Sequence, residues 1–184
     1  MTLARFRVRW IALAFAIVLV AFGVVLAVQT RSEPSIPRLV LEHATAPQLH
    51  LKTLDGKTVT SAQLRSKTYV VNFFNSWCIP CQQETPALKS FYDQHKSEGD
   101  FAMLGIIIDD NAPTMRGYVR DQRIAWPVLV DPNGSAALDY GTTGQPETYV
   151  IAPDGVVVCG TLGPSSVAVL NAWLAAARGG QQCT

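Results

Sequence analysis

The sequence has few charged side chains and no large excess of either sign. Only 16% of its 184 residues are Asp, Glu, Lys or Arg, while 48% are apolar. This balance excludes an intrinsically disordered or collagen-like chain, and the length suits about one domain of roughly 100–200 residues. Four of the 15 Lys and Arg precede residue 32, so 11 remain in the body of the chain against 14 Asp and Glu. A mildly acidic body argues against nucleic-acid binding, and we expect no nucleic-acid partner.

Patterns that bind metals are also scarce. The three histidines, His43, His50 and His95, are scattered singly, and the sequence holds one CxxC motif, at Cys78 and Cys81. A structural zinc site needs a second CxxC or a pair of histidines at a suitable spacing. We therefore expect no metal and no other cofactor.

One long apolar run lies near the N-terminus. Residues 10–28 contain no charged or polar side chain, and as a helix they would extend about 28 Å, close to the hydrocarbon thickness of a bilayer. Three arginines precede this run, so the positive-inside rule predicts that residues 1–9 are cytoplasmic. A cleaved signal peptide is the alternative, because Val25-Leu26-Ala27 is an acceptable cleavage site, although signal h-regions usually run about 7–15 residues. We predict a single-pass membrane anchor and an extracytoplasmic, periplasmic body.

The remaining chain has the pattern of one α/β domain. Residues 29–45 contain prolines and little periodicity, which predicts a tether, and residues 46–184 form the predicted domain. Strands that alternate with helices and end in a hairpin and a helix predict a mixed sheet. The expected strands are two short ones around Asp55-Gly56, then 69–74, 101–108, 128–130, 148–152 and 156–159, and the expected helices are 78–96, 113–123, 135–140 and 167–177.

The CxxC motif stands where a strand ends and a helix begins, within Trp77-Cys78-Ile79-Pro80-Cys81. The unpaired N–H groups and the dipole at a helix N-terminus stabilise a thiolate, and the second sulfur lies one turn further along. This arrangement favours a redox-active pair over an inert structural disulfide. A peroxiredoxin pattern would place Thr three residues before the reactive cysteine, but Asn75 stands there.

Two segments of the chain resemble a known family. The segment Trp77 to Pro86, read as Trp-Cys-x-Pro-Cys-x-x-Glu-x-Pro, is similar to the thiol:disulfide interchange proteins of the DsbE, CcmG, ResA and TlpA type. Residues 144–151 resemble the Gly-x-Pro-Glu-Thr-Phe-Leu-Ile segment of the same membrane-anchored proteins. The likeness extends over residues 46–178. It implies a thioredoxin fold with a mixed central sheet flanked by helices, an N-terminal β-hairpin extension and an N-terminal transmembrane helix.

The resemblance also implies roles for individual residues. Cys78 would be the attacking nucleophile and Cys81 the resolving thiol. Pro146 would be a cis-proline that faces them, a rare conformation found in roughly 5–6% of X–Pro bonds. In such folds the backbone of the preceding residue, here Gln145, pairs with an extended substrate. We expect Trp77 to contact substrate as well.

Glu84 is expected to serve the resolving thiol. Conventional thioredoxins carry an Asp six residues before the first cysteine, but here that position is Asn72, which does not titrate. Glu84 lies three residues after Cys81, so a helix places it within one turn of the second sulfur. The resemblance independently points to an acid at this position. We expect a partly buried carboxyl group with a raised pKa that exchanges a proton with Cys81. The alternative is a surface glutamate that complements the helix dipole.

Cys159 and Cys183 depart from the pattern expected of the family. An even number of cysteines in an exported chain predicts a second, structural disulfide between them. The alternative is a buried free thiol at Cys159 and a loose thiol in the tail.

Adjacent carboxylates, Asp109 and Asp110, follow the strand expected at 101–108. A carboxylate just before a helix accepts hydrogen bonds from its first backbone N–H groups. We therefore expect this pair to cap the next helix rather than to bind a metal or act in acid–base chemistry.

The predicted activity is thiol:disulfide exchange outside the cytoplasm. The resemblance implies that the protein reduces the disulfide in the haem-attachment Cys-x-x-Cys-His segment of apocytochrome c, or disulfides of other exported thiol proteins. A membrane electron donor of the DsbD/CcdA type would then re-reduce it. An oxidant that introduces disulfides into exported proteins is an alternative, because the direction depends on the reduction potential. A copper-binding chaperone that uses both thiols as soft ligands is a second alternative.

Overall fold

A computed structural model describes residues 15–23, 41, 43–181 and 183, and the chain divides into two units, residues 1–36 and 37–184. In the first unit, residues 15–23 are helical. No helix among the described residues is both long and apolar enough to cross a membrane. The predicted anchor at 10–28 and the tether at 29–45 fall largely outside the described residues, so both stay predictions.

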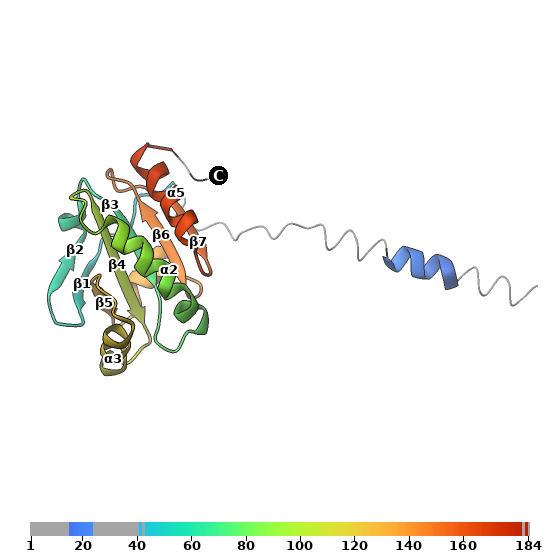
Figure 1. The fold of residues 1–184 in the computed structure, drawn as a ribbon, viewed down its shortest axis with the longest axis horizontal. Helices are drawn as coiled ribbons and strands as arrows, with labels where there is room; N and C mark the ends of the chain where they lie inside the picture. The colour runs from blue at the N-terminus through green and yellow to red at the C-terminus, as the bar shows by residue number, and fades with distance from the viewer. Residues whose placement is uncertain (1–14, 24–40, 42, 182, 184) are drawn as a thin grey trace, which may run out of the picture. The chain divides into compact units, whose positions relative to one another are not determined.

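The second unit is built on a mixed sheet of seven strands in the order β2-β1-β5-β4-β3-β6-β7 (Figure 1). Strands β3, β4 and β5 run parallel to one another, while β1, β2, β6 and β7 pair antiparallel with their neighbours. The predicted N-terminal hairpin is therefore confirmed, as β1 and β2. The strands are β1 (His50–Thr53), β2 (Thr58–Thr60), β3 (Thr68–Phe73), β4 (Phe101–Ile108), β5 (Val128–Asp131), β6 (Glu147–Ile151) and β7 (Val157–Leu162).

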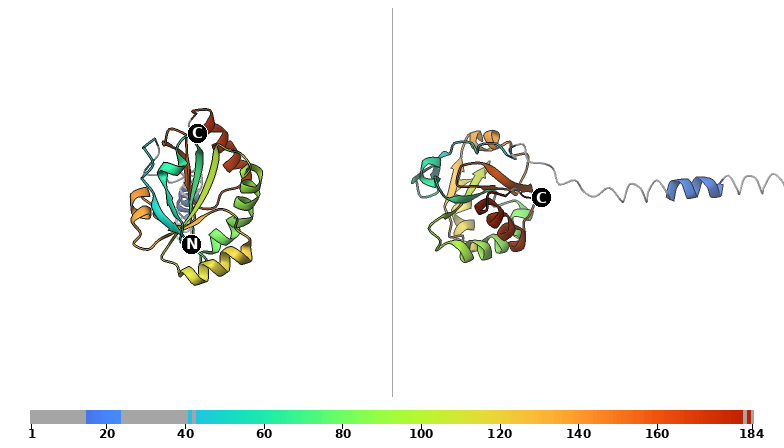
Figure 2. Two further views of the ribbon diagram at one scale, coloured as in Figure 1. Left: turned by 90° about the vertical axis from the view of Figure 1, so that its left-hand side faces the viewer. Right: turned by 90° about the horizontal axis from the view of Figure 1, so that it is seen from above.

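Helices cover both faces of this sheet, as the two views in Figure 2 show. Side chains of α2 (Ile79–His95), α3 (Ala112–Gln122) and α5 (Val167–Arg178) pack against one face. The other face is covered by α4 (Ser135–Tyr140) and by the 3-10 helix η1 (Ser61–Leu64), which the sequence patterns do not predict. Since both faces of the central strands are buried, these strands read in the sequence as continuous apolar runs.

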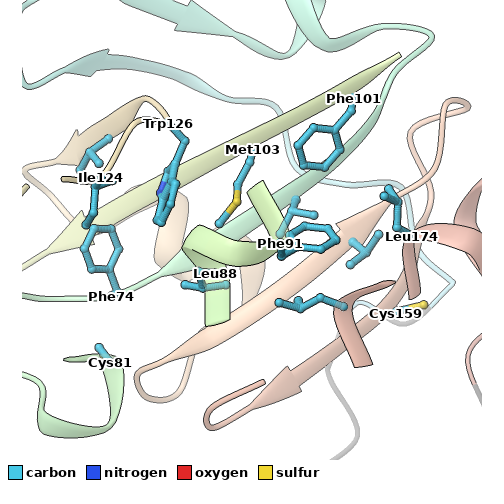
Figure 3. Close-up of a cluster of buried hydrophobic side chains, with 14 of the residues drawn as sticks. Phe74, Cys81, Leu88, Phe91, Phe101, Met103, Ile124, Trp126, Cys159 and Leu174 are labelled. Carbon is cyan, nitrogen blue, oxygen red and sulfur yellow. The ribbon is translucent and has the colours of Figure 1, made fainter. Parts of the chain in front are cut away.

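The first of these two cores holds helix α2 in place. Leu88 and Phe91 of this helix are buried against Met103 of β4 (Figure 3). Figure 3 also shows that Cys81 lies at one end of the labelled side chains and Cys159 at the other. The start of α2 is therefore fixed at the edge of a packed core.

Three segments that are distant in the sequence meet at one edge of the sheet. The last residue of β3, Phe73, pairs with Ile106 near the end of the parallel strand β4. Phe73 also pairs with Glu147, the first residue of the antiparallel strand β6. Consequently the loop after β3, the loop after β4 and the loop before β6 all lie at this edge, beside the start of α2.

Candidate active site

The two cysteines of the CxxC motif form a disulfide at the start of α2. Cys78 is the N-cap residue of the helix, and its Sγ accepts a hydrogen bond of 3.2 Å from the backbone N–H of Cys81. Pro80 occupies the first turn of the helix, where its missing N–H leaves no bond unmade. In the reduced protein, the same N–H group and the positive end of the helix dipole stabilise a thiolate at Cys78.

Two exposed apolar side chains flank Cys78 in the sequence. Cys78 and Cys81 are buried, but their neighbours Trp77 and Ile79 expose 60% and 66% of their surfaces. Large exposed apolar side chains beside a reactive group are typical of a site that receives another polypeptide. The position of Trp77 suits the substrate contact expected of it, and that role stays a prediction.

Asp110 holds the loop that leads into the CxxC motif. Its Oδ2 accepts a hydrogen bond of 2.6 Å from the backbone N–H of Ser76. The N-cap of α3 is instead Asn111, whose side chain accepts a bond of 3.2 Å from the N–H of Thr114. The expectation that Asp109 and Asp110 cap this helix is therefore wrong. The helix begins one residue later than the pair would require, and Asp110 bonds across to the CxxC loop.

Pro146 lies in the loop that leads into β6, at the same edge as the disulfide. The Gln145–Pro146 peptide bond is cis, and Pro146 is buried. Gln145 is linked to the CxxC loop, because its Oε1 accepts a hydrogen bond of 3.0 Å from Nδ2 of Asn75. The structure thus brings together the segments predicted to carry the cysteines and the substrate-binding residues.

Glu84 is buried on α2, with only 2% of its surface exposed. Its Oε1 accepts a bond of 2.7 Å from the backbone N–H of Ser165, and its Oε2 accepts a bond of 3.3 Å from Nδ2 of Asn72. Burial raises the pKa of Glu84 to about 7, although these hydrogen bonds favour the ionised form and oppose the shift. Glu84 is therefore not the surface glutamate of the alternative interpretation, while its part in proton transfer stays a prediction.

Asn72 links Glu84 to strand β6. Its Nδ2 also donates a bond of 2.9 Å to Oγ1 of Thr148, two residues after Pro146. Among the described residues, nothing donates to the buried Oδ1 of Asn72. A half-turn of this amide would place Oδ1 against Glu84 and Thr148, where a protonated carboxyl group and the hydroxyl could both donate to it. The network therefore has one arrangement suited to the ionised carboxylate and another suited to the neutral acid.

A second disulfide joins Cys159 of β7 to Cys183 in the C-terminal tail, with a Cα–Cα distance of 5.4 Å. Cys159 is fully buried. The 24-residue separation encloses the whole of α5 and also Ser165, the residue that donates to Glu84. A structural role for this bond, as opposed to a catalytic one, stays a prediction.

Within the part of the chain that the structure describes, no cluster of three His, Cys, Asp or Glu side chains could hold a metal ion. The CxxC motif is equipped for thiol exchange, since it has a helix N-terminus for one sulfur and a buried acid on the same helix as the other.

The sequence patterns did not identify three residues of the site. Asn75 and Asp110 act through long-range hydrogen bonds, and Ser165 contributes only its backbone N–H. One sequence feature could identify Asn75 as a site residue: it is polar, it follows a continuous apolar strand directly, and it lies three positions before Cys78. No local pattern identifies a backbone donor that comes from 81 residues away.

Comparisons with known proteins agree with this geometry. The thiol:disulfide interchange protein CycY of Rhizobium leguminosarum bv. viciae is 32% identical over 109 residues, which cover 59% of this chain and 56% of that protein. The thiol-disulfide oxidoreductase ResA of Bacillus thuringiensis subsp. konkukian is 26% identical over 113 residues, which cover 61% of this chain and 65% of that protein. The chain thus matches less than two thirds of the length of either relative.

Solved structures give the same result. A thiol:disulfide interchange protein of the thioredoxin family from Chlorobium tepidum TLS superposes with a TM-score of 0.64 and 32% identity. The superposition covers 72% of this chain and 94% of the other. A model of the AhpC/TSA family matches residues 43–159, more than half of the chain. The protein therefore belongs to the AhpC/TSA family.

Proposed function

We propose that this protein is a thiol:disulfide oxidoreductase and that it acts as a reductant outside the cytoplasm on disulfides of exported proteins, including the haem-attachment Cys-x-x-Cys-His segment of apocytochrome c. The observation that carries the proposal is the Cys78–Cys81 pair at the start of α2 together with the buried Glu84 on the same helix. The similarity to proteins named as thiol:disulfide interchange protein and thiol-disulfide oxidoreductase supports it.

The reaction begins with the reduced pair. The Cys78 thiolate attacks one sulfur of the substrate disulfide, the substrate S–S bond breaks, and the departing substrate thiolate takes up a proton from water. A mixed disulfide now joins Cys78 to the substrate. The Cys81 thiol then loses its proton and attacks Sγ of Cys78, which releases the second substrate thiolate. Two electrons have moved from the Cys78–Cys81 pair to the substrate.

Glu84 is suited to the second half of this reaction. Cys81 is buried, so its thiol needs a nearby base before it can attack the mixed disulfide. A carboxyl group with a pKa of about 7 is partly ionised at neutral pH and can take up this proton. The Asn72 network then accommodates the neutral acid, as described above.

The oxidised product must be reduced again for a second turnover. An oxidising compartment does not supply the electrons, so the proposal includes a dithiol donor in the membrane, of the DsbD/CcdA type. It also includes the anchor at residues 10–28, which would keep the domain on the extracytoplasmic side of the cell membrane and close to that donor.

A stopped-flow assay tests this proposal directly. The reduced protein is mixed with an oxidised peptide that carries a Cys-x-x-Cys-His disulfide, and free peptide thiols are followed with time. We expect one equivalent of reduced peptide per protein, and none with the Cys78→Ser variant. If the peptide stays oxidised while the oxidised protein instead converts the reduced peptide to its disulfide, the protein is an oxidant.

A further inference from the structure

Asn75 is a fully buried polar residue at the centre of the site, and the mechanism above does not use it. Its side chain lies between two of the converging loops. Oδ1 accepts a hydrogen bond of 3.3 Å from the backbone N–H of Ile108, and Nδ2 donates a bond of 3.0 Å to Oε1 of Gln145. Its backbone carbonyl accepts a bond of 3.3 Å from the N–H of Cys78. Asn75 therefore connects the cysteine loop, the end of β4 and the loop that contains Pro146.

These bonds fix the orientation of two amide groups. The backbone N–H of Ile108 can only donate, so the oxygen of the Asn75 side chain must face it. The NH2 group of Asn75 consequently faces Gln145, and Gln145 must present its oxygen in return. The NH2 group of Gln145 is thereby turned away from Asn75. Among the described residues, no acceptor is bonded to it.

Gln145 stands next to Pro146, at the edge where an extended substrate would bind. It is partly exposed, and its NH2 group is the end of the amide that faces away from the buried Asn75. An extended polypeptide presents a backbone carbonyl at each residue, and such a carbonyl is a suitable acceptor. Without the bond to Asn75, the Gln145 side chain would have no fixed orientation and would lose rotamer freedom when a substrate binds.

We propose that Asn75 is a positioning residue for protein substrates, because it orients the Gln145 amide so that its NH2 group donates to a backbone carbonyl of the bound chain. The inference rests on the proposed function, since it concerns polypeptide disulfides. Asn75 acts through Gln145 and does not itself touch the substrate. It should therefore affect substrates with an extended backbone and not small disulfides that lack one.

A double-mutant cycle tests this coupling. We expect Asn75→Ala and Gln145→Ala each to lower the second-order rate constant for the oxidised Cys-x-x-Cys-His peptide about fivefold, which corresponds to the loss of one neutral hydrogen bond. Reduction of hydroxyethyl disulfide, which has no backbone carbonyl to accept the bond, should slow less than reduction of the peptide in both variants. In the Gln145→Ala background, Asn75→Ala should add no further loss, because its effect passes through Gln145.

Asn171→Ala is the matched control. Asn171 also donates from Nδ2 to a glutamine Oε1, that of Gln94, at 2.9 Å, but near the far end of α2. This variant removes the same type of bond and should leave both rate constants unchanged, while thermal unfolding reports the stability of every variant.

Equal slowing of both disulfides by Asn75→Ala, or losses that multiply in the double variant, would overturn the inference. If the wild-type protein reduces the peptide and Gln145→Ala does so equally fast, only the inference fails. If the wild type does not reduce it, the proposed function fails first.

Discussion

Replacing Cys81 with alanine is expected to arrest the reaction at the mixed disulfide between Cys78 and the substrate. Without the neighbouring thiol, resolution depends on external thiols, and the lost intramolecular attack should slow turnover by at least about a hundredfold. Mass spectrometry under non-reducing conditions should detect an adduct of one peptide per protein, which dithiothreitol releases. Cys78 is the sulfur that carries this adduct, because it is the N-cap of α2 and accepts the N–H bond of residue 81.

The matched variant is Cys78→Ala, which should form no adduct at all. Cys81 is then the only thiol of the motif, and it lies inside the helix, without the N-cap position that stabilises a thiolate at Cys78. An adduct that forms through Cys81 in this variant would reverse the assigned order of attack. Adducts through Cys159 or Cys183 would show that the second disulfide opens and exchanges, which contradicts its predicted structural role.

The second large effect is expected from Glu84→Gln. The amide keeps the size of the side chain but cannot accept the proton of Cys81. Resolution of the mixed disulfide should therefore slow by about a hundredfold at pH 7, and its dependence on pH around 7 should flatten. Glu98→Gln is a suitable control, because Glu98 follows the same helix but bonds to Arg178 on the surface. If Glu84→Gln resolves the mixed disulfide at the wild-type rate and with the wild-type pH profile, the acid has no catalytic role.

The same variant should alter how stability depends on pH. The pKa of Glu84 is about 7 in the folded protein and 4.5 as its ordinary value, so the folded state binds the proton more tightly. The contribution of Glu84 to the free energy of unfolding is fully present below about pH 4.5. It is lost as the pH rises through about 7, which lowers the free energy of unfolding by about 3 kcal/mol. Glu84→Gln should remove that loss, and its amide can bond to Oδ1 of Asn72 after the half-turn described above. Urea denaturation at pH 4.5 and pH 8 measures the difference. An unchanged pH dependence would contradict the raised pKa.

Most of the fold could be predicted because its local signals agree with one another. The strand at 101–108 and the helix at 135–140 coincide with the observed β4 and α4, and the other elements differ by one to three residues at their ends. Continuous apolar runs mark strands that are buried on both faces, and Asp55-Gly56 marks the hairpin turn. The exception is η1, a single turn of 3-10 helix at Ser61–Leu64 that is too short for periodicity to identify.

The residue patterns themselves predict the site only where its residues are close in the sequence, whereas Pro146 and Gln145 are expected only from the family resemblance. The cysteine pair and the neighbouring Glu84 belong to one short helical motif, and their spacing along the helix predicts their roles in thiol exchange. The sequence near Asp110 indicates a helix cap and not its actual role, because the N–H of Ser76 that bonds to it lies 34 residues earlier in the chain. The bond between Asn75 and Gln145 joins residues 70 positions apart. Such contacts depend on the pairing of β3, β4 and β6, which local patterns do not specify.

The reduction potential of the Cys78–Cys81 pair tests the central claim most directly. It is measured by equilibration with glutathione buffers in a Cys159→Ser, Cys183→Ser double variant, so that only one disulfide titrates. A reductant of exported proteins requires a potential well below about −180 mV, toward the roughly −270 mV of thioredoxin, and this is the result we predict. A potential well above about −180 mV, toward the roughly −120 mV of the strong oxidant DsbA, would contradict the proposed direction of the reaction.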